Sequence, residues 1–402
     1  MLTAFVEIWY GLLLALGLLA TLASTYSIFL GRRFSHKVVE SLGRRRVGFQ
    51  PQACVIMACK GYEPNLEENI GALLKQNYPN YRVRIVTDSE EDPAYGIAEK
   101  ILKFVKEPRV ELLTSTQYPN ASGKVSALLT ALGKNEEEVE VYAFVDSDAT
   151  ISSSWLSDLV DPLSDASVGA TTGFRWYFAS GFWSEIQSAW NASGSNLMFD
   201  EKYNFPWGGA MALRKETLNQ IHLKSIWKDA VSDDLTLNIA LRVNGYHTIF
   251  LPQCTVATFT KNITRTKLLK WVINQTALTR TYHRRLWNYA LTAYLFFNVT
   301  FILGLVALTL GFLDTTSWLI PCILLLTPLP LGIVRSRSRR NAFKRALPWL
   351  SRDFEKFSSR MSLSTLIVPW IMTFCIFKSI STREIEWRGR SYSLRKVGIA
   401  AS

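Results

Sequence analysis

The chain has 402 residues, of which 48% are hydrophobic and 19% charged, and its formal net charge is +12. This length accommodates one large soluble core together with several membrane segments. The basic residues lie beside apolar runs rather than on an aromatic-rich polar face, so we expect no nucleic-acid partner. The five cysteines show neither metal-site nor disulfide spacing, which is typical of a reducing cytoplasm.

The first apolar run covers residues 5–30 and contains a single charged residue, Glu7. A membrane span needs roughly 20 such residues. The run lacks the basic start and the cleavage site of a signal peptide, so we expect a retained transmembrane anchor over residues 1–31. A basic juxtamembrane linker follows at 32–49, and by the positive-inside rule it places the next domain on the cytoplasmic face.

Two further apolar runs, 289–313 and 318–334, predict a transmembrane hairpin within residues 286–335. Residues 336–402 form a basic region that contains a third, shorter apolar run at 363–377, interrupted by Pro369. Both flanks of this run are basic, which conflicts with a single crossing of the membrane. We therefore favour a re-entrant or in-plane segment followed by a cytoplasmic tail. The chain is thus expected to be a multi-pass integral membrane protein.

Between residues 50 and 285, short apolar runs alternate with helical patterns, which predicts an α/β domain with a mostly parallel sheet. The runs 53–58 and 81–87 are expected strands, and a helix is expected to begin near Pro64. A strand is also expected over 168–177 and a basic amphipathic helix over 265–282. We expect this domain to be the catalytic one.

Two acids, Asp146 and Asp148, follow the buried strand pattern Tyr142–Val145. The crevice beyond the carboxyl ends of strands is where open α/β sheets bind ligands. Two carboxylates there suit Mg²⁺ or Mn²⁺, which bind few protein oxygens and bridge to phosphates. The alternative is a strand-to-helix turn in which Asp148 caps the next helix.

Three more positions have both a binding and a structural interpretation. Asp88 ends the second strand, where it either accepts hydrogen bonds from a nucleoside or serves as a turn residue. Lys124 opens a helix, where it either meets a diphosphate or remains solvated. Trp207 precedes two glycines, where it either stacks on a sugar or is buried at a tight turn.

The pair Asp233 and Asp234 begins another helix after Ser232. Acids in a first helical turn are favoured by the macrodipole, and Ser232 is a suitable cap. The same position at the mouth of the crevice suits a general base. The helix over 265–282 carries Lys267, Lys270 and Trp271, which either face the membrane interface or meet a diphosphate.

Taken in order, these segments resemble the family 2 and ceramide-glucosyltransferase-like (family 21) membrane glycosyltransferases. The motifs that carry the resemblance are Gln76-Asn-Tyr-Pro-Asn80, Thr87-Asp-Ser-Glu-Glu-Asp-Pro-Ala94, Gly123-Lys124, Asp146-Ser-Asp148, Asp233-Asp234, Lys267-Leu-Leu-Lys270-Trp271 and Glu386-Trp-Arg-Gly-Arg-Ser-Tyr392. The two lysines at 267 and 270 depart from the family pattern, because lysine lacks the bidentate fork of arginine.

The resemblance implies a GT-A nucleotide-sugar domain and transfer of a hexose, glucose first, with inversion from a UDP-sugar to the hydroxyl of a membrane lipid such as ceramide or diacylglycerol. It implies Asp234 and Asp233 as catalytic residues, and Asp146 and Asp148 as ligands of Mg²⁺ or Mn²⁺. The nucleotide-sugar residues that it implies are Asp88, Lys124, Asp146, Lys267, Lys270 and Trp271, with Trp207 and Trp387 at the acceptor site.

Three alternatives remain open. A polyprenyl phosphate is the nearest rival acceptor. A polysaccharide synthase shares the soluble motifs but needs more helices to enclose a channel. A membrane-anchored nucleotide-sugar binder is the non-enzymatic alternative. No obligate protein partner is expected.

Overall fold

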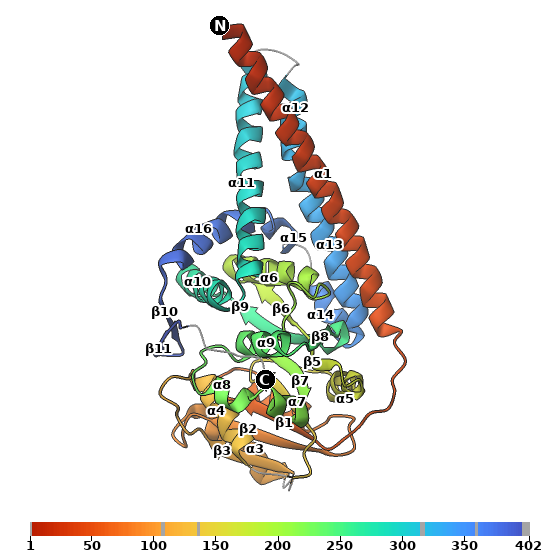
Figure 1. The fold of residues 1–402 in the computed structure, drawn as a ribbon, viewed down its shortest axis with the longest axis vertical. Helices are drawn as coiled ribbons and strands as arrows, with labels where there is room; N and C mark the ends of the chain where they lie inside the picture. Colours follow the sequence, from red (N-terminus) through yellow and green to blue (C-terminus); the bar gives the residue numbers. More distant parts are fainter. Residues whose placement is uncertain (1, 106–108, 135–136, 314–317, 358–360, 396–402) are drawn as a thin grey trace.

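The computed structural model describes residues 2–105, 109–134, 137–313, 318–357 and 361–395. Figure 1 shows an elongated molecule with an α/β domain at one end and a bundle of long helices at the other. Smaller helices lie between the two, at the base of the bundle. The predicted α/β architecture is confirmed in this arrangement, together with a separate part formed by long apolar helices.

A seven-stranded sheet forms the centre of the α/β domain. Its order is β3-β2-β1-β4-β7-β5-β8, with β7 antiparallel to β4 and β5 and the other neighbours parallel. The strands are β1 (Ala53–Ala58), β2 (Tyr81–Thr87), β3 (Val110–Thr114), β4 (Val141–Asp146), β5 (Val168–Thr172), β7 (Ala210–Arg214) and β8 (His247–Phe250). The central strands are almost wholly buried, as continuous apolar runs in a helix-covered sheet should be.

The predicted strand over 168–177 is two strands that belong to different sheets. After β5 the chain turns at Gly173 into β6 (Arg175–Ser180), which pairs in parallel with β9 (Val256–Lys261). A Cβ atom on Gly173 would lie 2.0 Å from the carbonyl oxygen of Cys254. The close backbone approach therefore requires glycine and fixes the point at which the chain leaves the large sheet.

Helices cover both sheets and connect their strands. They are α2 (Leu66–Leu73), α3 (Pro93–Val105), α4 (Gly123–Gly133), α5 (Trp155–Val160), α6 (Phe182–Gly194), α7 (Lys215–Gln220), α8 (Leu223–Trp227), α9 (Asp233–Val243) and α10 (Arg265–Tyr282), with 3-10 turns η1 (Asp161–Ser164), η2 (Ser195–Leu197) and η3 (Pro252–Cys254). Ser122, Ser232 and Thr264 cap α4, α9 and α10 by accepting hydrogen bonds from the backbone N–H groups three residues on.

The bundle contains three helices that are long and apolar enough to cross a membrane, among the residues described. They are formed by α1 (Leu2–Leu42), α11 (Arg284–Leu313) and the pair α12 (Leu319–Leu326) and α13 (Pro328–Ala346). The first helix continues through residues 32–42, part of the expected linker. It packs along α12 and α13, where Gly17 lies against Leu324 and the Thr21 hydroxyl donates to the Leu324 carbonyl at 3.1 Å.

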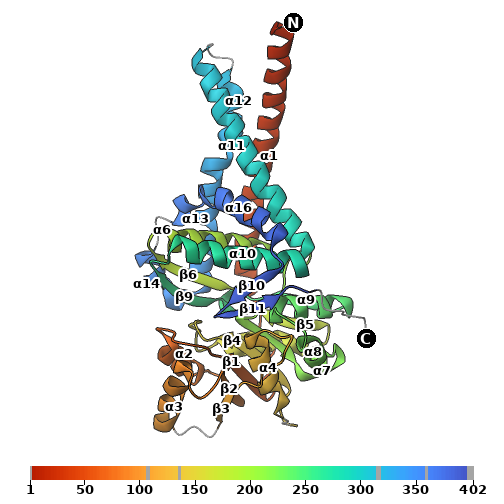
Figure 2. The same cartoon turned by 90° about the vertical axis from the view of Figure 1, so that its left-hand side faces the viewer.

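The third apolar run forms a helix that lies across the base of the bundle (Figures 1 and 2). This helix, α16 (Val368–Ser381), follows η5 (Pro348–Leu350), α14 (Ser351–Lys356) and α15 (Met361–Ser364). Its 14 residues extend about 21 Å at a rise of about 1.5 Å each, less than the roughly 30 Å of a bilayer core. One face is buried, whereas Trp370, Phe374 and Phe377 are exposed on the other. These features favour an in-plane orientation.

The chain ends in a two-stranded hairpin, β10 (Glu384–Trp387) and β11 (Arg390–Ser393). The hairpin lies beside α10 and α9, on the α/β domain (Figure 2). Ile385 is buried there with Leu235, Ala277 and Tyr282. The carboxy-terminal segment therefore returns from α16 to the same side of the bundle as the large sheet.

Candidate active site

The site begins where β4 ends, at Asp146. Lys124, in the first turn of α4, donates to Asp146 Oδ1 at 2.7 Å and lies 3.0 Å from Asp233 Oδ2. Its ammonium group also donates to the carbonyl of Gly208 at 3.1 Å. One lysine thus connects a strand end, a helix start and the glycine turn before β7. The predicted residues Lys124, Asp146 and Asp233 are brought together.

A second cation, Arg175 at the start of β6, connects the two acids of the Asp-Ser-Asp segment. Its Nη1 and Nη2 donate to Asp148 Oδ2 and Oδ1 at 2.6 and 2.7 Å, and Nη2 also donates to Asp146 Oδ2 at 2.6 Å. The guanidinium group lies 4.9 Å from the ring centre of Trp207 and donates to the Tyr177 hydroxyl at 3.2 Å. Arg175 therefore orients both carboxylates and itself contacts the aromatic side chains of Trp207 and Tyr177.

These charges control the ionisation of the site. Burial alone would raise the pKa of Asp146, but the Lys124 and Arg175 charges outweigh it and lower that pKa. Burial alone would lower the pKa of Lys124, but Asp146 and Asp233 raise it. Both groups are therefore charged at neutral pH. An anionic diphosphate that enters here meets two fixed cations and a helix amino terminus.

Asp234 has a different environment from its neighbour. Its Oδ1 accepts from the Ser232 hydroxyl and from Leu235 N, the latter at 2.7 Å, while Oδ2 is 3.5 Å from Gly208 N. Within the described residues it has no ion-pair partner, whereas Asp233 pairs with Lys124. Burial and the nearby Asp233 charge raise the pKa of Asp234 to about 6. A carboxylate of this kind suits a general base.

Two glycines bring the backbone close to the acids. A Cβ atom on Gly208 would lie 2.2 Å from Asp233 Oδ2 and 3.1 Å from Lys124 Nζ. A Cβ atom on Gly209 would lie 2.6 Å from Asp146 Oδ2 and 2.0 Å from the ring of Trp207. The glycines after Trp207 are therefore required for the cluster to form. Trp207 itself is partly buried against Phe174 and Arg175.

Asp88 lies at the end of β2 and is bound by the carboxy-terminal hairpin. Arg390 donates to Asp88 Oδ2 at 2.8 Å, Lys60 lies 3.1 Å from the same oxygen, and Gln117 donates to Oδ1 at 3.2 Å. The Tyr392 hydroxyl accepts from Gly123 N at 3.0 Å, next to Lys124. The hairpin therefore contacts both the end of β2 and the start of α4.

The motif on α10 is placed beside this hairpin. Lys270 pairs with Glu386 at 2.7 Å, so it reaches the strand that carries Trp387 rather than the acids. Trp271 packs edge-on against Trp190 and Tyr177, with ring centres 4.8 and 6.0 Å away. It thereby adjoins Arg175 through the Tyr177 hydroxyl. Lys267 is exposed in the first turn of α10, away from these contacts.

Arg175, Lys60 and Gln117 were not predicted as site residues, and Arg390 was given no role. One signal was available for Arg175, which is a lone charge inside the apolar and aromatic run at 168–178. A buried arginine requires an ion-pair partner. Asp146 and Asp148 precede it in the sequence, and neither had an assigned ion-pair partner. Lys60 and Gln117 follow β1 and β3 as ordinary polar loop residues, and no local signal distinguishes them.

The carboxylates fit a divalent cation in number and chemistry. Asp146 and Asp148 offer four oxygens at one point, and Mg²⁺ or Mn²⁺ at nucleotide sites uses one or two carboxylates plus phosphate oxygens. No cluster of three or more metal-ligating side chains occurs among the described residues. The two acids therefore form a site that nucleotide oxygens would complete. Arg175 would have to yield part of its contact with them.

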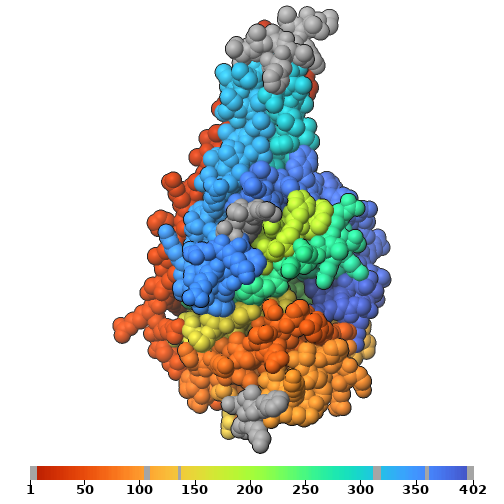
Figure 3. Space-filling view, turned by 180° about the vertical axis from the view of Figure 1, so that it is seen from behind, coloured from red at the N-terminus to blue at the C-terminus, as the bar shows by residue number. Residues whose placement is uncertain are grey.

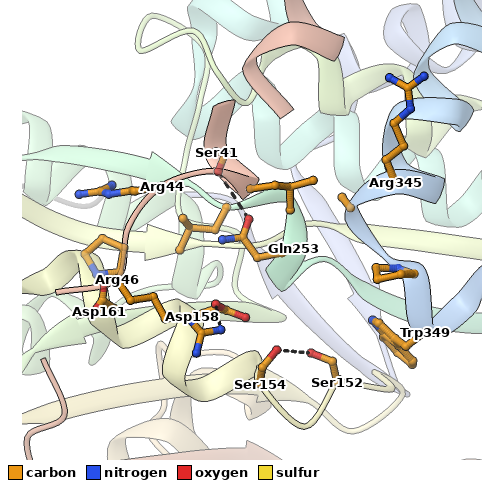
Figure 4. Close-up of a pocket in the computed structure, with 15 residues that line it drawn as sticks. Ser41, Arg44, Arg46, Ser152, Ser154, Asp158, Asp161, Gln253, Arg345 and Trp349 are labelled. Atoms are coloured by element: carbon orange, nitrogen blue, oxygen red, sulfur yellow. Dashed lines mark hydrogen bonds and ion pairs between the residues drawn. The ribbon is translucent and has the colours of Figure 1, made fainter. Parts of the chain in front are cut away.

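A separate pocket lies where α1 meets the α/β domain. Seen from behind, α1 and α13 lie side by side down to this joint (Figure 3), and the pocket there measures about 290 Å³ (Figure 4). Arg46 in this pocket pairs with Asp158. Asp161 accepts from the backbone N–H groups of Val47 and Gly48 at 2.9 and 2.8 Å. The acids thus hold the segment that leaves α1, and we interpret this pocket as a structural joint rather than a second active site.

The sheet and the helices that cover it form a GT-A-like fold. The mannosyltransferase PcManGT from Pyrobaculum calidifontis, solved with GDP-Man and Mn²⁺, has a similar fold, with a TM-score of 0.51 and 14% identity over 92% of this chain and 99% of that one. GalNAc-T7 with UDP, GalNAc and Mn²⁺ gives a TM-score of 0.39 and 12% identity over 56% of this chain and 48% of that one.

The model of glycosyl transferase family 21 matches residues 12–400, so the chain belongs to that family. A ceramide glucosyltransferase from Komagataella phaffii is 30% identical over 115 residues, which are 27% of this chain and 22% of that protein. The predicted family and fold are confirmed. The matched region spans about a fifth of the length of that relative.

Proposed function

We propose that this protein transfers a hexose, glucose first among the candidates, from a UDP-sugar to the hydroxyl group of a membrane lipid such as ceramide or diacylglycerol. The observation that carries the proposal is that two adjacent aspartates at the start of α9 have different environments. Asp233 is neutralised by Lys124, whereas Asp234 lacks an ion pair in the described structure and has a pKa raised to about 6. This division separates phosphate binding from proton transfer.

The donor would lie across the carboxyl ends of β1, β2 and β4. Asp88, with Lys60 and Gln117, would bind the nucleoside, and Lys124 with the amino terminus of α4 would bind the diphosphate. Arg390 of the hairpin pairs with Asp88, and we propose that it also contacts the nucleotide. This arginine supplies the planar fork that the lysines on α10 lack.

The acceptor hydroxyl would attack the anomeric carbon from the face opposite the diphosphate. Asp234 would accept the hydroxyl proton as the new C–O bond forms, and the bond to the diphosphate oxygen would break, so that UDP leaves and the anomeric configuration inverts. Lys124 stabilises the charge that develops on the leaving oxygen. Trp207 would bound the sugar site, since it packs against Arg175 beside Asp146.

We propose that Asp146 and Asp148 hold Mg²⁺ or Mn²⁺ together with the diphosphate. The ion supplies neutralisation of the leaving group when bound. Arg175 would keep the two carboxylates in position, and its second role would be to prevent their mutual repulsion before the donor arrives. The mannosyltransferase of similar fold was solved in complex with GDP-Man and Mn²⁺, which is in keeping with this assignment.

The lipid acceptor would approach from the base of the bundle. Helices α16 and α6 lie on this level (Figure 2), and both carry exposed aromatic residues, among them Phe374 and Phe182. A membrane surface there would place a lipid hydroxyl near the aromatic wall of Trp271, Trp190 and Tyr177, with Trp387 on the opposite hairpin. We propose a multi-pass membrane location with the α/β domain on the cytoplasmic face, in keeping with the basic residues after α1.

The test is UDP release by purified full-length protein in mixed micelles. UDP-glucose, UDP-galactose and UDP-N-acetylglucosamine are each offered with ceramide, diacylglycerol or polyprenyl phosphate, with and without Mn²⁺. We expect turnover that requires one hydroxyl lipid and the metal ion. Turnover with polyprenyl phosphate alone would change the acceptor class. Nucleotide binding without turnover on any lipid would contradict the enzymatic proposal.

A further inference from the structure

A buried arginine at the base of the bundle has no ion-pair partner among the described residues. Arg339 on α13 is 3% exposed, and its Nε and Nη1 have no hydrogen-bond partner within the described part of the chain. Its charged neighbour on the same helix is Arg335, one turn earlier, and Tyr294 of α11 also acts on it electrostatically. Burying an unpaired charge costs several kcal/mol, and a like-charged neighbour adds to that cost. This arrangement calls for a negatively charged ligand.

A second buried polar group on α13 also lacks a hydrogen-bond partner among the described residues. Ser336, one turn before Arg339, is fully buried and its Oγ has no partner among the described residues. Tyr294 of α11 lies close enough to act electrostatically on Arg335 and Arg339, and its hydroxyl is 3.2 Å from Ser193 Oγ of α6. Two side chains one turn apart on α13 therefore carry polar atoms that have no partner within the described residues. Phosphate oxygens accept several such bonds at once.

The position of these residues along the bundle identifies the source of the anion. On α13 the apolar stretch ends at Val334 and the basic stretch begins at Arg335. Gly31 of α1 lies against the side chain of Arg335, so Arg32 and Arg33 follow at the same level. Figures 1 and 2 show this level at the base of the bundle, beside α15, α16 and α6. Lipid around the apolar helices would place its headgroups here.

We propose that Arg339, with Arg335 and Ser336, binds the phosphate group of an anionic membrane phospholipid whose headgroup enters between α13, α11 and α6. The site is separate from the Asp146 cluster and does not depend on the proposed sugar transfer. The bound headgroup satisfies the guanidinium and hydroxyl groups that the protein leaves unpaired. It also fixes the depth of the bundle in the membrane relative to the α/β domain.

The experiment measures the Tm of delipidated full-length protein in detergent, with added phosphatidylglycerol, phosphatidylcholine or inorganic phosphate. Wild-type protein is expected to gain about 2–4 °C with phosphatidylglycerol, as a ligand that binds only the folded state stabilises it. Arg339→Met is expected to lose this gain. Arg337→Gln removes an exposed arginine from the same helix and is expected to keep it.

Arg339→Met is expected to fold without lipid, because it replaces an unpaired buried charge by an apolar chain of similar length. If it fails to fold, Ser336→Ala with native mass spectrometry of retained phosphatidylglycerol provides the second measurement, with a smaller retained fraction expected. An equal gain in Arg339→Met and wild type would overturn the site. A gain with inorganic phosphate and none with lipid would overturn the lipid assignment.

Discussion

Two neighbouring aspartates, Asp233 and Asp234, have different partners, and on this difference rest the proposed roles in phosphate binding and proton transfer. Asp233 is held by Lys124, which also holds Asp146. Asp234 is held by Ser232 and a backbone N–H, neither of which neutralises it. The same helix start therefore provides a fixed ionic contact and a titratable group.

Asp234→Asn is expected to reduce transfer by about 10²–10⁴-fold, the usual contribution of a general base. UDP binding should change little, since Asp234 contacts neither Lys124 nor the strand-end acids. The measurement is kcat with calorimetric UDP affinity. Asp165→Asn, which alters an exposed acid in a turn, serves as the control. Unchanged turnover in Asp234→Asn would remove this residue as the base.

The same group predicts a pH dependence. Because the pKa of Asp234 is raised to about 6, the carboxylate is protonated below that pH and cannot accept the hydroxyl proton. We expect kcat to rise with pH through about 6 and then level off. The pKa of Asp234 is higher in the folded protein than in the unfolded chain. Ionisation of Asp234 therefore lowers the stability of the folded protein as pH rises from the ordinary aspartate pKa to about 6. Asp234→Asn should therefore lose this decline in Tm, and a decline of the same size in the variant would contradict the assignment.

Asp148→Asn tests the proposed metal ligand. It removes one of the two carboxylates that Arg175 holds together, and it should weaken the Mn²⁺-dependent part of UDP affinity while the metal-independent part stays. The measurement is titration of UDP with and without Mn²⁺. The matched control is Asp158→Asn, which removes a carboxylate that pairs with Arg46 near α1. Equal metal dependence in Asp148→Asn and wild type would count against the site.

At the scale of elements, the carboxy-terminal β-hairpin is the part of the fold that contacts both ends of the proposed donor site. It brings Arg390 to Asp88 and Tyr392 to the start of α4, across more than 260 residues of sequence. Its own strands bury little, and Ile385 provides its main apolar contact. The hairpin is therefore held largely by polar contacts with the site that it covers.

Arg390→Gln is expected to weaken UDP binding by roughly tenfold, about 1.4 kcal/mol. The glutamine keeps a hydrogen-bond donor but loses the charge that faces Asp88 and Gln117. The control is Arg383→Gln, an exposed arginine before the same hairpin whose backbone carbonyl accepts from Leu394 N. Equal losses in both variants, measured by calorimetry, would indicate a general charge effect rather than a nucleotide contact.

The glycine turn before β7, Gly208 and Gly209, predicts that a small substitution there reduces activity by displacing neighbouring site residues. Gly208→Ala places a methyl group 2.2 Å from Asp233 Oδ2, so Asp233 and Lys124 must move and transfer should fall sharply. Gly71→Ala places its methyl in open space within α2, and it should raise stability by roughly 0.5–1 kcal/mol without loss of activity. Full activity in Gly208→Ala would show that the Lys124–Asp233 contact is dispensable.

At the scale of the whole molecule, the sequence predicted the elements whose signal is local. The strands 53–58 and 81–87 and the helix 265–282 have the observed bounds, because apolar runs, turn residues and a Thr264 cap mark their ends. The break at Gly173 was missed because its cause is the distant carbonyl of Cys254. Arg175 and Arg390 were missed as site residues for the same reason, since their partners lie far away in the sequence.

The position of the β10–β11 hairpin predicts on which side of a membrane the residues after α16 lie. The β10–β11 hairpin packs on the α/β domain, and α16 is too short to span a bilayer. The residues before and after α16 should therefore lie on the same side of the membrane. In intact vesicles, Ser391→Cys should react with a membrane-impermeant thiol reagent from the same side as Lys202→Cys on the α/β domain. Thr316→Cys, between the two predicted transmembrane segments 289–313 and 318–334, should react from the opposite side.

The native cysteines give a low background in this assay, because all five are buried. Each variant is also labelled after the vesicles are opened with detergent, which shows that the introduced thiol is reactive. If Ser391→Cys and Thr316→Cys react from the same side and Lys202→Cys from the other, α16 crosses the membrane and the hairpin cannot contact Asp88. The Arg390→Gln effect on UDP binding would then vanish as well, so the two measurements test one arrangement at two scales.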